Sequence, residues 1–217
     1  MTLGPRLGAA AELAVKLHGT QVKKRTETPY LAHLFSVCSL VLADGGSENE
    51  AIAALLHDAL EDRPDAITPE AIQDRFNEEV LEIVVACTDV PPGWKGGEKP
   101  PWFKRKRDYI ERVRHEPARF LRVALADKVD NIRSILRDHG ELGDALWRRF
   151  NGGQTGSVWY YHKLLGAFRD AGLSGRRLDE YDKLVGQLLN QTGLSASDLA
   201  HYESGETDRL VSSAVMR

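Results

Sequence analysis

Apolar residues return every three or four positions along most of this 217-residue chain, and this periodicity constrains the fold more than any other feature. Residues at that spacing form one face of an α-helix, which is buried when helices pack against one another. The sequence has no succession of alternating, β-branched segments of the kind that form a β-sheet. It therefore predicts an all-α protein, a bundle of helices.

The expected helices are separated by short segments that fit helix ends. We predict helices over residues 6–18, 30–43, 48–62, 69–76, 78–89, 101–115, 117–138, 141–148, 156–171 and 177–191. Thr68, Pro69 and Glu70 fit an N-cap, a first-turn proline and an acid that complements the helix dipole. The longest irregular segment, residues 90–101, is rich in proline and glycine, and long loops in compact domains are often functional.

The length of the chain suits one domain with enough residues to bury a core. The helical pattern weakens after Gly193. We therefore expect residues 1–192 to form the main domain and residues 193–217 to form a C-terminal extension that is partly disordered.

Composition narrows the classes of partner. The net charge of −3, from 29 basic and 32 acidic residues, gives no reason to expect a nucleic acid polymer or a membrane surface. Cys38 and Cys87 lie in apolar helical patterns, so we expect buried free thiols and a reducing, cytoplasmic location. The N-terminal segment lacks the uninterrupted apolar core of a signal peptide, and no apolar run is long enough to span a bilayer.

The segment ALLHDALED, residues 54–62, places a histidine and three carboxylates at the end of an apolar run. In one continuous helix, residues four apart share a face, so His57 would lie beneath Glu61 and Asp58 beneath Asp62. Burying such groups is costly unless they are paired or bound to a metal. The pattern indicates a compact polar corner on an apolar helix.

Two other predicted helices carry the same anomaly. RVALADKVDNIRSIL sets two polar residues, Asp127 and Asn131, four apart in an apolar pattern, and PYLAHLFSV places a histidine inside an apolar helix start. Two imidazoles and two carboxylates suit Mn²⁺ or another borderline-hard divalent ion, and ligation without cysteine argues against a structural zinc site. The candidate metal ligands are His33, His57, Asp58 and Asp127.

Each of these residues has a plainer explanation when it is taken alone. A single buried histidine is more often a hydrogen-bonded core residue than a ligand, and Asp127 or Asn131 could bond to nearby backbone. Glu61 and Asp62 could form a solvated helix end. One metal would explain together why three separate helices each place a costly polar group on an apolar face, so the metal site is the stronger hypothesis.

The motifs resemble the HD-domain metal-dependent phosphohydrolases, whose pattern is a histidine, a His-Asp pair and a distant aspartate. His33, His57, Asp58 and Asp127 match that pattern. More narrowly, the chain is similar to the alarmone hydrolases of the Rel and SpoT type, particularly their stand-alone small forms. KKRTETPYLAH, ALLHDALED, CTDV, FKRKRDYI, ALADKVDN and SVWYY occur in that family's order and at similar spacing, over roughly residues 12–170.

The resemblance implies catalytic and substrate-binding roles. Glu61 and Asp62 match the acidic pair after the His-Asp motif, and Asn131 matches the polar residue four after the distant aspartate, so these three are the implied catalytic residues. A polyanionic substrate also needs cations outside the metal shell. Basic runs are commonly solvated and aromatic residues commonly belong to the core, but the match favours a substrate role for some of them. The expected substrate-binding residues are Lys24, Arg25, Thr26, Lys99, Arg105, Lys106 and Tyr160.

The chain departs from the family pattern at several positions that bear on base recognition. Lys24 and Arg25 stand where the family commonly has Arg then Lys, Glu27 replaces a glycine, Leu34 replaces a proline, and Lys104 replaces a glutamate. Arginine stacks on a base in ways that lysine does not. Guanine and adenine substrates therefore both stay open.

The resemblance implies a Mn²⁺-dependent hydrolase that removes the 3′-pyrophosphate from a (p)ppGpp-type guanosine, or adenosine, 3′,5′-polyphosphate. It would clear this alarmone of the stringent response, with Glu61 or Asp62 orienting or deprotonating the attacking water. Two alternatives are an HD phosphohydrolase acting on other nucleotides and a non-catalytic, nucleotide-sensing HD module. The chain keeps every ligand and the acidic pair, which favours an enzyme. The sequence leaves the oligomeric state open.

Overall fold

The computed structural model describes residues 3–24, 26–89, 94 and 96–215, and in this part of the chain the regular elements are helices, with one isolated β-bridge. The predicted all-α class is confirmed. In chain order the helices are α1 (Pro5–His18), α2 (Leu31–Ala43), α3 (Glu48–Leu56), α4 (Ala59–Asp62), α5 (Pro69–Arg75), α6 (Glu78–Cys87), α7 (Trp102–His115), α8 (Ala118–Leu142), the 3₁₀ helix η1 (Gly143–Arg149), α9 (Gly153–Asp170), α10 (Arg176–Thr192) and α11 (Ala196–Val215).

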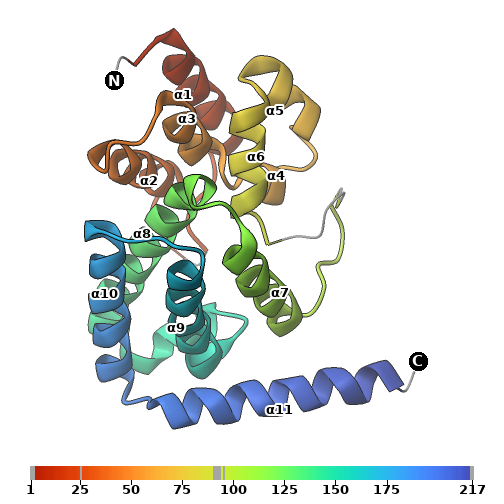
Figure 1. Cartoon of the computed structure of the whole chain (residues 1–217), viewed down its shortest axis with the longest axis vertical. Coiled ribbons are helices and arrows are strands. Elements are labelled where there is room, and N and C mark those ends of the chain that lie inside the picture. Colours follow the sequence, from red (N-terminus) through yellow and green to blue (C-terminus); the bar gives the residue numbers. More distant parts are fainter. Residues whose placement is uncertain (1–2, 25, 90–93, 95, 216–217) are drawn as a thin grey trace.

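Helix α8 runs through the middle of the molecule (Figure 1) and joins its two halves. It packs against α2, α3 and α6 from the N-terminal half and against α10 from the C-terminal half. Leu121 and Ile132 of α8 are fully buried, as are Leu34 of α2 and Ile52 of α3. Because α8 crosses the whole core, polar side chains on it meet elements that lie far apart in the sequence.

The turn between α2 and α3 fixes the angle at which these two helices meet. Ser47 caps α3 by accepting from the Glu50 amide, and the Glu50 carboxylate accepts from the Ser47 amide at 2.7 Å. A Cβ atom on Gly46 would lie 2.5 Å from a Val41 side-chain carbon, so the close turn requires glycine there. This capping box explains why the predicted break between the two helices lies at this point.

The predicted single helix over residues 48–62 is wrong at its most informative position. Helix α3 ends at Leu56, the chain turns through His57 and Asp58, and the short helix α4 follows. His57 Nδ1 donates to the carbonyl of Ala54, an acceptor that a continuous helix would use for the Asp58 amide. The histidine and the aspartate therefore lie in a turn, where both can point to one side.

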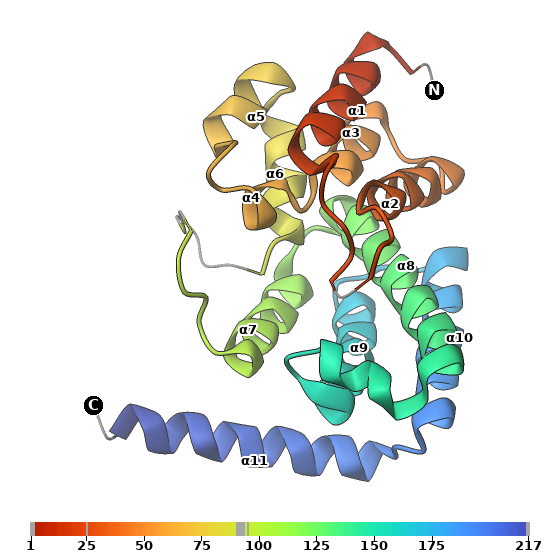
Figure 2. The same ribbon diagram turned by 180° about the vertical axis from the view of Figure 1, so that it is seen from behind.

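The C-terminal part of the chain contains a helix that the sequence pattern did not predict. Helix α11 lies along one end of the molecule in both views (Figure 1, Figure 2) and packs against α9. Its anchor residues are Leu199, which is 1% exposed, and Tyr202, whose hydroxyl lies 2.6 Å from the position of a Cβ atom on Gly156. A side chain on Gly156 would displace this contact.

Two expectations about the whole chain can be compared with the structure. Cys38 and Cys87 are buried and free, as predicted. Among the described residues, no helix combines the length and the apolar character needed to cross a bilayer.

Candidate metal centre and substrate pocket

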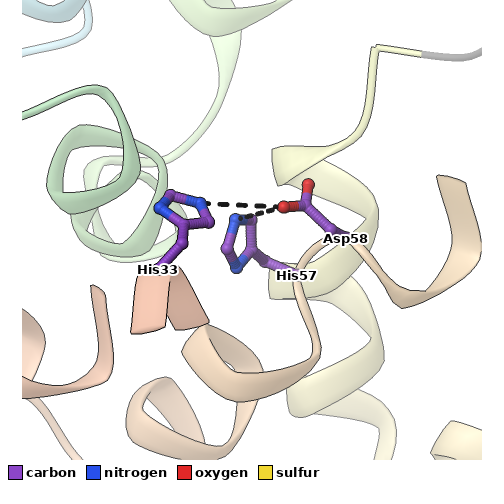
Figure 3. A group of neighbouring side chains, drawn as sticks. All are labelled: His33, His57 and Asp58. Carbon is purple, nitrogen blue, oxygen red and sulfur yellow. Dashed lines mark ion pairs between the residues drawn. The ribbon is translucent and has the colours of Figure 1, made fainter. Parts of the chain in front are cut away.

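Four side chains from three separate elements converge near the middle of α8. His33 comes from α2, His57 and Asp58 come from the turn after α3, and Asp127 comes from α8. His33 Nε2 lies 3.1 Å from Asp127 Oδ1, and His57 Nε2 lies 2.9 Å from Asp58 Oδ2. Figure 3 shows His33, His57 and Asp58 turned toward one another. The structure therefore brings all four predicted ligands together, and three of them form a compact group of possible metal-binding atoms.

Both imidazoles direct their Nε2 atoms toward these carboxylates. His57 Nδ1 donates to the carbonyl of Ala54 at 2.9 Å, and His33 Nδ1 donates to Asp130 Oδ2 at 2.7 Å. A neutral imidazole with its proton on Nδ1 has a lone pair on Nε2. Two lone pairs facing two carboxylates repel unless a cation lies between them, so the arrangement requires either protons or a metal ion.

In the protein without metal, protonation of the imidazoles would supply that charge. Burial alone would lower the pKa of His57, but the negative charges of Asp58 and Asp127 raise this pKa well above its ordinary value. Burial likewise opposes protonation of His33, and its hydrogen bonds to Asp127 and Asp130 raise its pKa. The site thus favours positive charge, either as protons on the imidazoles or as a metal ion.

The donor set fits a divalent metal ion. The two Nε2 atoms lie 2.9–3.8 Å from the oxygens of Asp58 and Asp127. Ligand bonds of about 2.0–2.2 Å place neighbouring ligand atoms about 3 Å apart. Mixed imidazole and carboxylate donors suit borderline-hard ions.

Asp127 is held by two neighbours on its own helix. Lys128 Nζ forms an ion pair with Oδ2, and Asn131 Nδ2 donates to Oδ1 at 2.6 Å. Burial would raise the pKa of Asp127, but Lys128 and the two imidazoles hold it well below its usual range. Asn131, predicted to be catalytic, therefore contacts a candidate ligand directly and also faces the cavity beside it.

The two acidic residues of α4 occupy different surroundings. Glu61 lines the cavity next to the candidate metal centre and pairs with Lys99 at 2.7 Å. Asp62 is exposed, does not line that cavity, and accepts a hydrogen bond from Gln21 at 2.7 Å. Although part of Asp62 is exposed, the protein around its carboxyl desolvates it, and this desolvation and the nearby charge of Asp58 raise the pKa of Asp62 to about 6.

A cavity in two parts opens beside the candidate ligands. The inner chamber, of about 160 Å³, is bounded by His33, Asp58 and Asp127, and the outer cavity has a volume of about 480 Å³. Lys106 and Glu61 line both parts. Of the predicted substrate-binding residues, the outer cavity is lined by Lys24, Thr26, Lys99, Arg105 and Lys106, and the inner chamber by Lys106 and Tyr160. Arg25 lies outside the described residues.

The basic wall of the cavity is organised by a buried carboxylate. Asp89, whose side chain is 5% exposed, forms ion pairs with Arg105 and, at 2.6 Å, with Lys106. The Lys106 ammonium also lies 4.5 Å from the centre of the Tyr160 ring. Burial lowers the pKa of Lys106, and the charge of Asp89 opposes that change.

Several residues of the pocket were not predicted. Lys23 and Trp102 line the outer cavity, Lys128 lines the inner chamber, and Tyr30 and Asp89 line both. Tyr30 also donates its hydroxyl hydrogen to Asp58. Lys128 could have been found from the sequence, because it is a lysine inside the apolar run that flanks Asp127. Trp102 carried no comparable signal.

Residues 10–147 match the family described as the HD domain. The chain belongs to the HD domain family. This match contains all four candidate ligands and the acidic pair, so the family predicted from the motifs is confirmed.

Named relatives are similar to more than half of this chain. The chain is 35% identical over 131 residues to a guanosine-3′,5′-bis(diphosphate) 3′-pyrophosphohydrolase, MESH1, of Xenopus tropicalis, covering 59% of this chain and 68% of that protein. It is 36% identical over 127 residues to an enzyme with the same activity name from Aquifex aeolicus, covering 58% of this chain but 17% of that protein. This chain therefore spans about a sixth of the bacterial relative.

A solved structure agrees with this assignment. The structure described as "A metazoan ortholog of SpoT hydrolyzes ppGpp and plays a role in starvation responses" is similar with a TM-score of 0.68 and 26% sequence identity. The similarity covers 90% of this chain and 99% of that one. The resemblance to SpoT-type proteins thus extends from the motifs to the fold.

Proposed function

We propose that this protein is a metal-dependent hydrolase that removes the 3′-pyrophosphate from a guanosine, or adenosine, 3′,5′-polyphosphate. Support comes from the names of its relatives and from the pocket that adjoins the candidate metal centre. The substrate is a small nucleotide rather than a nucleic acid polymer.

The charge of the outer cavity is the observation that carries the proposal. Among the described residues, six basic side chains line it against three acidic ones. The basic residues are Lys23, Lys24, Lys99, Arg105, Lys106 and Arg149, and the acidic ones are Glu61, Asp89 and Asp138. A cavity with excess positive charge beside a candidate metal centre suits a substrate with several phosphates.

His33, His57, Asp58 and Asp127 would hold the metal ion, and Mn²⁺ is the ion that we propose. When bound, such an ion polarises a phosphoryl oxygen and lowers the pKa of a water molecule. The family and the His-His-Asp group agree with a divalent cation in general. Fixed Nδ1 protons leave both Nε2 atoms free to act as ligands.

Glu61 is the side chain that orients the attacking water and accepts its proton. It lines both parts of the cavity, whereas Asp62 is directed toward Gln21. Asp62 acts indirectly, through the hydrogen bond that it accepts from Gln21 and through the repulsion between its charge and that of Asp58. Asn131 holds Asp127 in place through its amide.

Lys106 and Lys128 neutralise the departing diphosphate in the inner chamber, which both residues line. Water adds across the bond between the 3′ oxygen and phosphorus, so the nucleoside regains its 3′-hydroxyl and the diphosphate leaves as pyrophosphate. Trp102, Phe150 and Asn151 line the outer cavity and offer two aromatic surfaces and an amide to a purine base.

The cellular location of the protein and its division into domains form part of the same proposal. Two buried, free cysteines support a reducing, cytoplasmic location. We assign residues 1–192 to the HD-type hydrolase domain and residues 193–217 to its extension.

The test is product analysis with a panel of nucleotides. Guanosine and adenosine 3′,5′-bis(diphosphates) are compared with GTP, ATP, GDP and ADP, all four of which have a free 3′-hydroxyl. Each nucleotide is tested first with Mn²⁺ and then with a chelator. We expect pyrophosphate only from substrates with a 3′-diphosphate and only with metal. Turnover of the ordinary nucleotides at the same rate would indicate a different HD phosphohydrolase, and tight binding without turnover would indicate a sensor.

A further inference from the structure

Asp130 lies directly behind His33, on the side away from the candidate metal centre. Asp127 and Asp130 are three residues apart on α8, so they share a face that meets α2. Asp130 Oδ2 accepts the Nδ1 hydrogen of His33 at 2.7 Å, and Oδ1 accepts the hydroxyl hydrogen of Ser36. His33 and Ser36 are themselves three apart on α2, so one carboxylate holds two points of that helix.

Asp130 is an unusual residue to bury. The residue is 9% exposed, and among the described residues the lysine or arginine that pairs with it is Lys23, whose Nζ lies 3.8 Å from Oδ2. Burying a carboxylate is costly unless hydrogen bonds and charge compensate it. Here the compensation comes from His33, Ser36 and Lys23. Because one of these partners is His33, the negative charge of Asp130 acts directly on that imidazole.

The two candidate histidine ligands differ in what orients them. His57 is oriented by the backbone carbonyl of Ala54, which is neutral. His33 is oriented by a carboxylate. A carboxylate behind a ligating imidazole fixes the tautomer and makes the opposite nitrogen a stronger donor.

We propose that Asp130 is a positioning residue that sets the metal affinity of the site by holding His33 with its proton on Nδ1 and its Nε2 toward Asp58 and Asp127. This inference rests on the proposed metal centre. Asp130 also links that centre to the substrate pocket, because its ion-pair partner Lys23 lines the outer cavity. Lys23 is held there by a further hydrogen bond, which it donates to Ser134 Oγ at 3.1 Å. Asp130 therefore holds one candidate ligand and one substrate-facing cation.

The experiment measures the Kd for Mn²⁺ by calorimetry for the whole chain and its variants. Asp130→Asn keeps the shape and one acceptor oxygen but loses the charge, and Asp130→Ala loses the contact. Removing such a partner typically weakens metal binding by about 10-fold to 100-fold, and we expect the order wild type, Asp130→Asn, Asp130→Ala. Glu141→Gln is the matched control, because it removes an exposed carboxylate from the same helix, and its Kd should equal that of the wild type.

Two further measurements separate positioning from a general loss of structure. In the metal-free protein, the Nδ1-bound proton of His33 should give a strongly downfield NMR signal that moves upfield in Asp130→Asn. Ser36→Ala removes the other hydrogen bond to Asp130 without touching His33, and it should weaken Mn²⁺ binding less than Asp130→Asn does. Melting curves of the metal-free variants identify any variant that fails to fold. If Asp130→Ala fails to fold, the Mn²⁺ affinity of Asp130→Asn decides whether Asp130 positions His33.

Unchanged Mn²⁺ affinity in folded Asp130→Asn and Asp130→Ala would overturn the proposal. Equal losses in Ser36→Ala and Asp130→Asn would do the same, because the contact with His33 would then not be the cause. Failure of the metal centre itself gives a different result: His57→Ala would then bind Mn²⁺ as tightly as the wild type.

Discussion

The ion pairs of Asp89 allow a quantitative prediction about the basic wall of the pocket. This carboxylate, 5% exposed, pairs with Arg105 and with Lys106, whose side chains are 9% and 19% exposed. Asp89→Ala would leave two largely buried cations without their carboxylate. Breaking a buried pair by removing one partner costs about 3–5 kcal/mol.

The expected loss is large enough to measure by thermal unfolding. For a domain of this size, each kcal/mol lowers the melting temperature by about 2–4 °C, so metal-free Asp89→Ala should melt about 6–20 °C below the wild type. Circular dichroism at 222 nm provides the assay. Added pyrophosphate should stabilise Asp89→Ala more than the wild type, because the anion can replace the lost carboxylate beside Lys106.

Two variants control this prediction. Asp89→Ala combined with Lys106→Met removes one of the two uncompensated charges, and it should regain part of the lost stability. Asp182→Ala breaks an exposed ion pair with Arg169, and it should cost less than about 1 kcal/mol. If Asp89→Ala melted within 2 °C of the wild type, in the range of Asp182→Ala, the buried pairs would not organise this wall.

Three further predictions concern the metal centre and the acidic pair. Mn²⁺ affinity should fall as the pH decreases, because the raised pKa values of His33 and His57 mean that metal binding must displace protons. Calorimetry at pH 8 and pH 6 tests this prediction, and equal affinities would contradict it. In metal-free protein the carboxyl of Asp62 should titrate near pH 6 by NMR, and Asp58→Asn should lower that pKa by removing a nearby negative charge; an unchanged value would exclude this coupling. Gln21→Ala removes the hydrogen bond to Asp62 and should lower kcat by about 10-fold with little change in KM, whereas a selective rise in KM would assign Gln21 to substrate binding instead.

Much of the fold and the centre could be predicted because the relevant signals are local. The three- and four-residue periodicity predicts the helices, and polar residues in apolar runs mark His33, His57 and Asp127 as unusual. Thr68 and Pro69 predict the start of α5, where Thr68 caps the helix. These signals depend on a few neighbouring residues each, so one sequence is enough to identify them.

The remaining features depend on contacts between distant segments. Asp130 looks like an ordinary polar residue of a helix until α2 places His33 against it. The break after Leu56 follows from a side chain that bonds to the backbone within its own turn, which the helical pattern does not reveal. In helix α11, Leu199 becomes an anchor only because α9 offers a surface for it. The division at residue 192 stays a prediction.

The most direct measurement is product analysis of wild type and Asp58→Ala with guanosine 3′,5′-bis(diphosphate) and one equivalent of Mn²⁺. The wild type should release pyrophosphate and guanosine 5′-diphosphate in equal amounts, and a chelator should stop the reaction. Asp58→Ala should lose both metal binding and turnover by about 100-fold or more, because it removes a ligand. Orthophosphate as the product, or pyrophosphate release by Asp58→Ala at the wild-type rate, would contradict a metal-dependent 3′-pyrophosphohydrolase at this site.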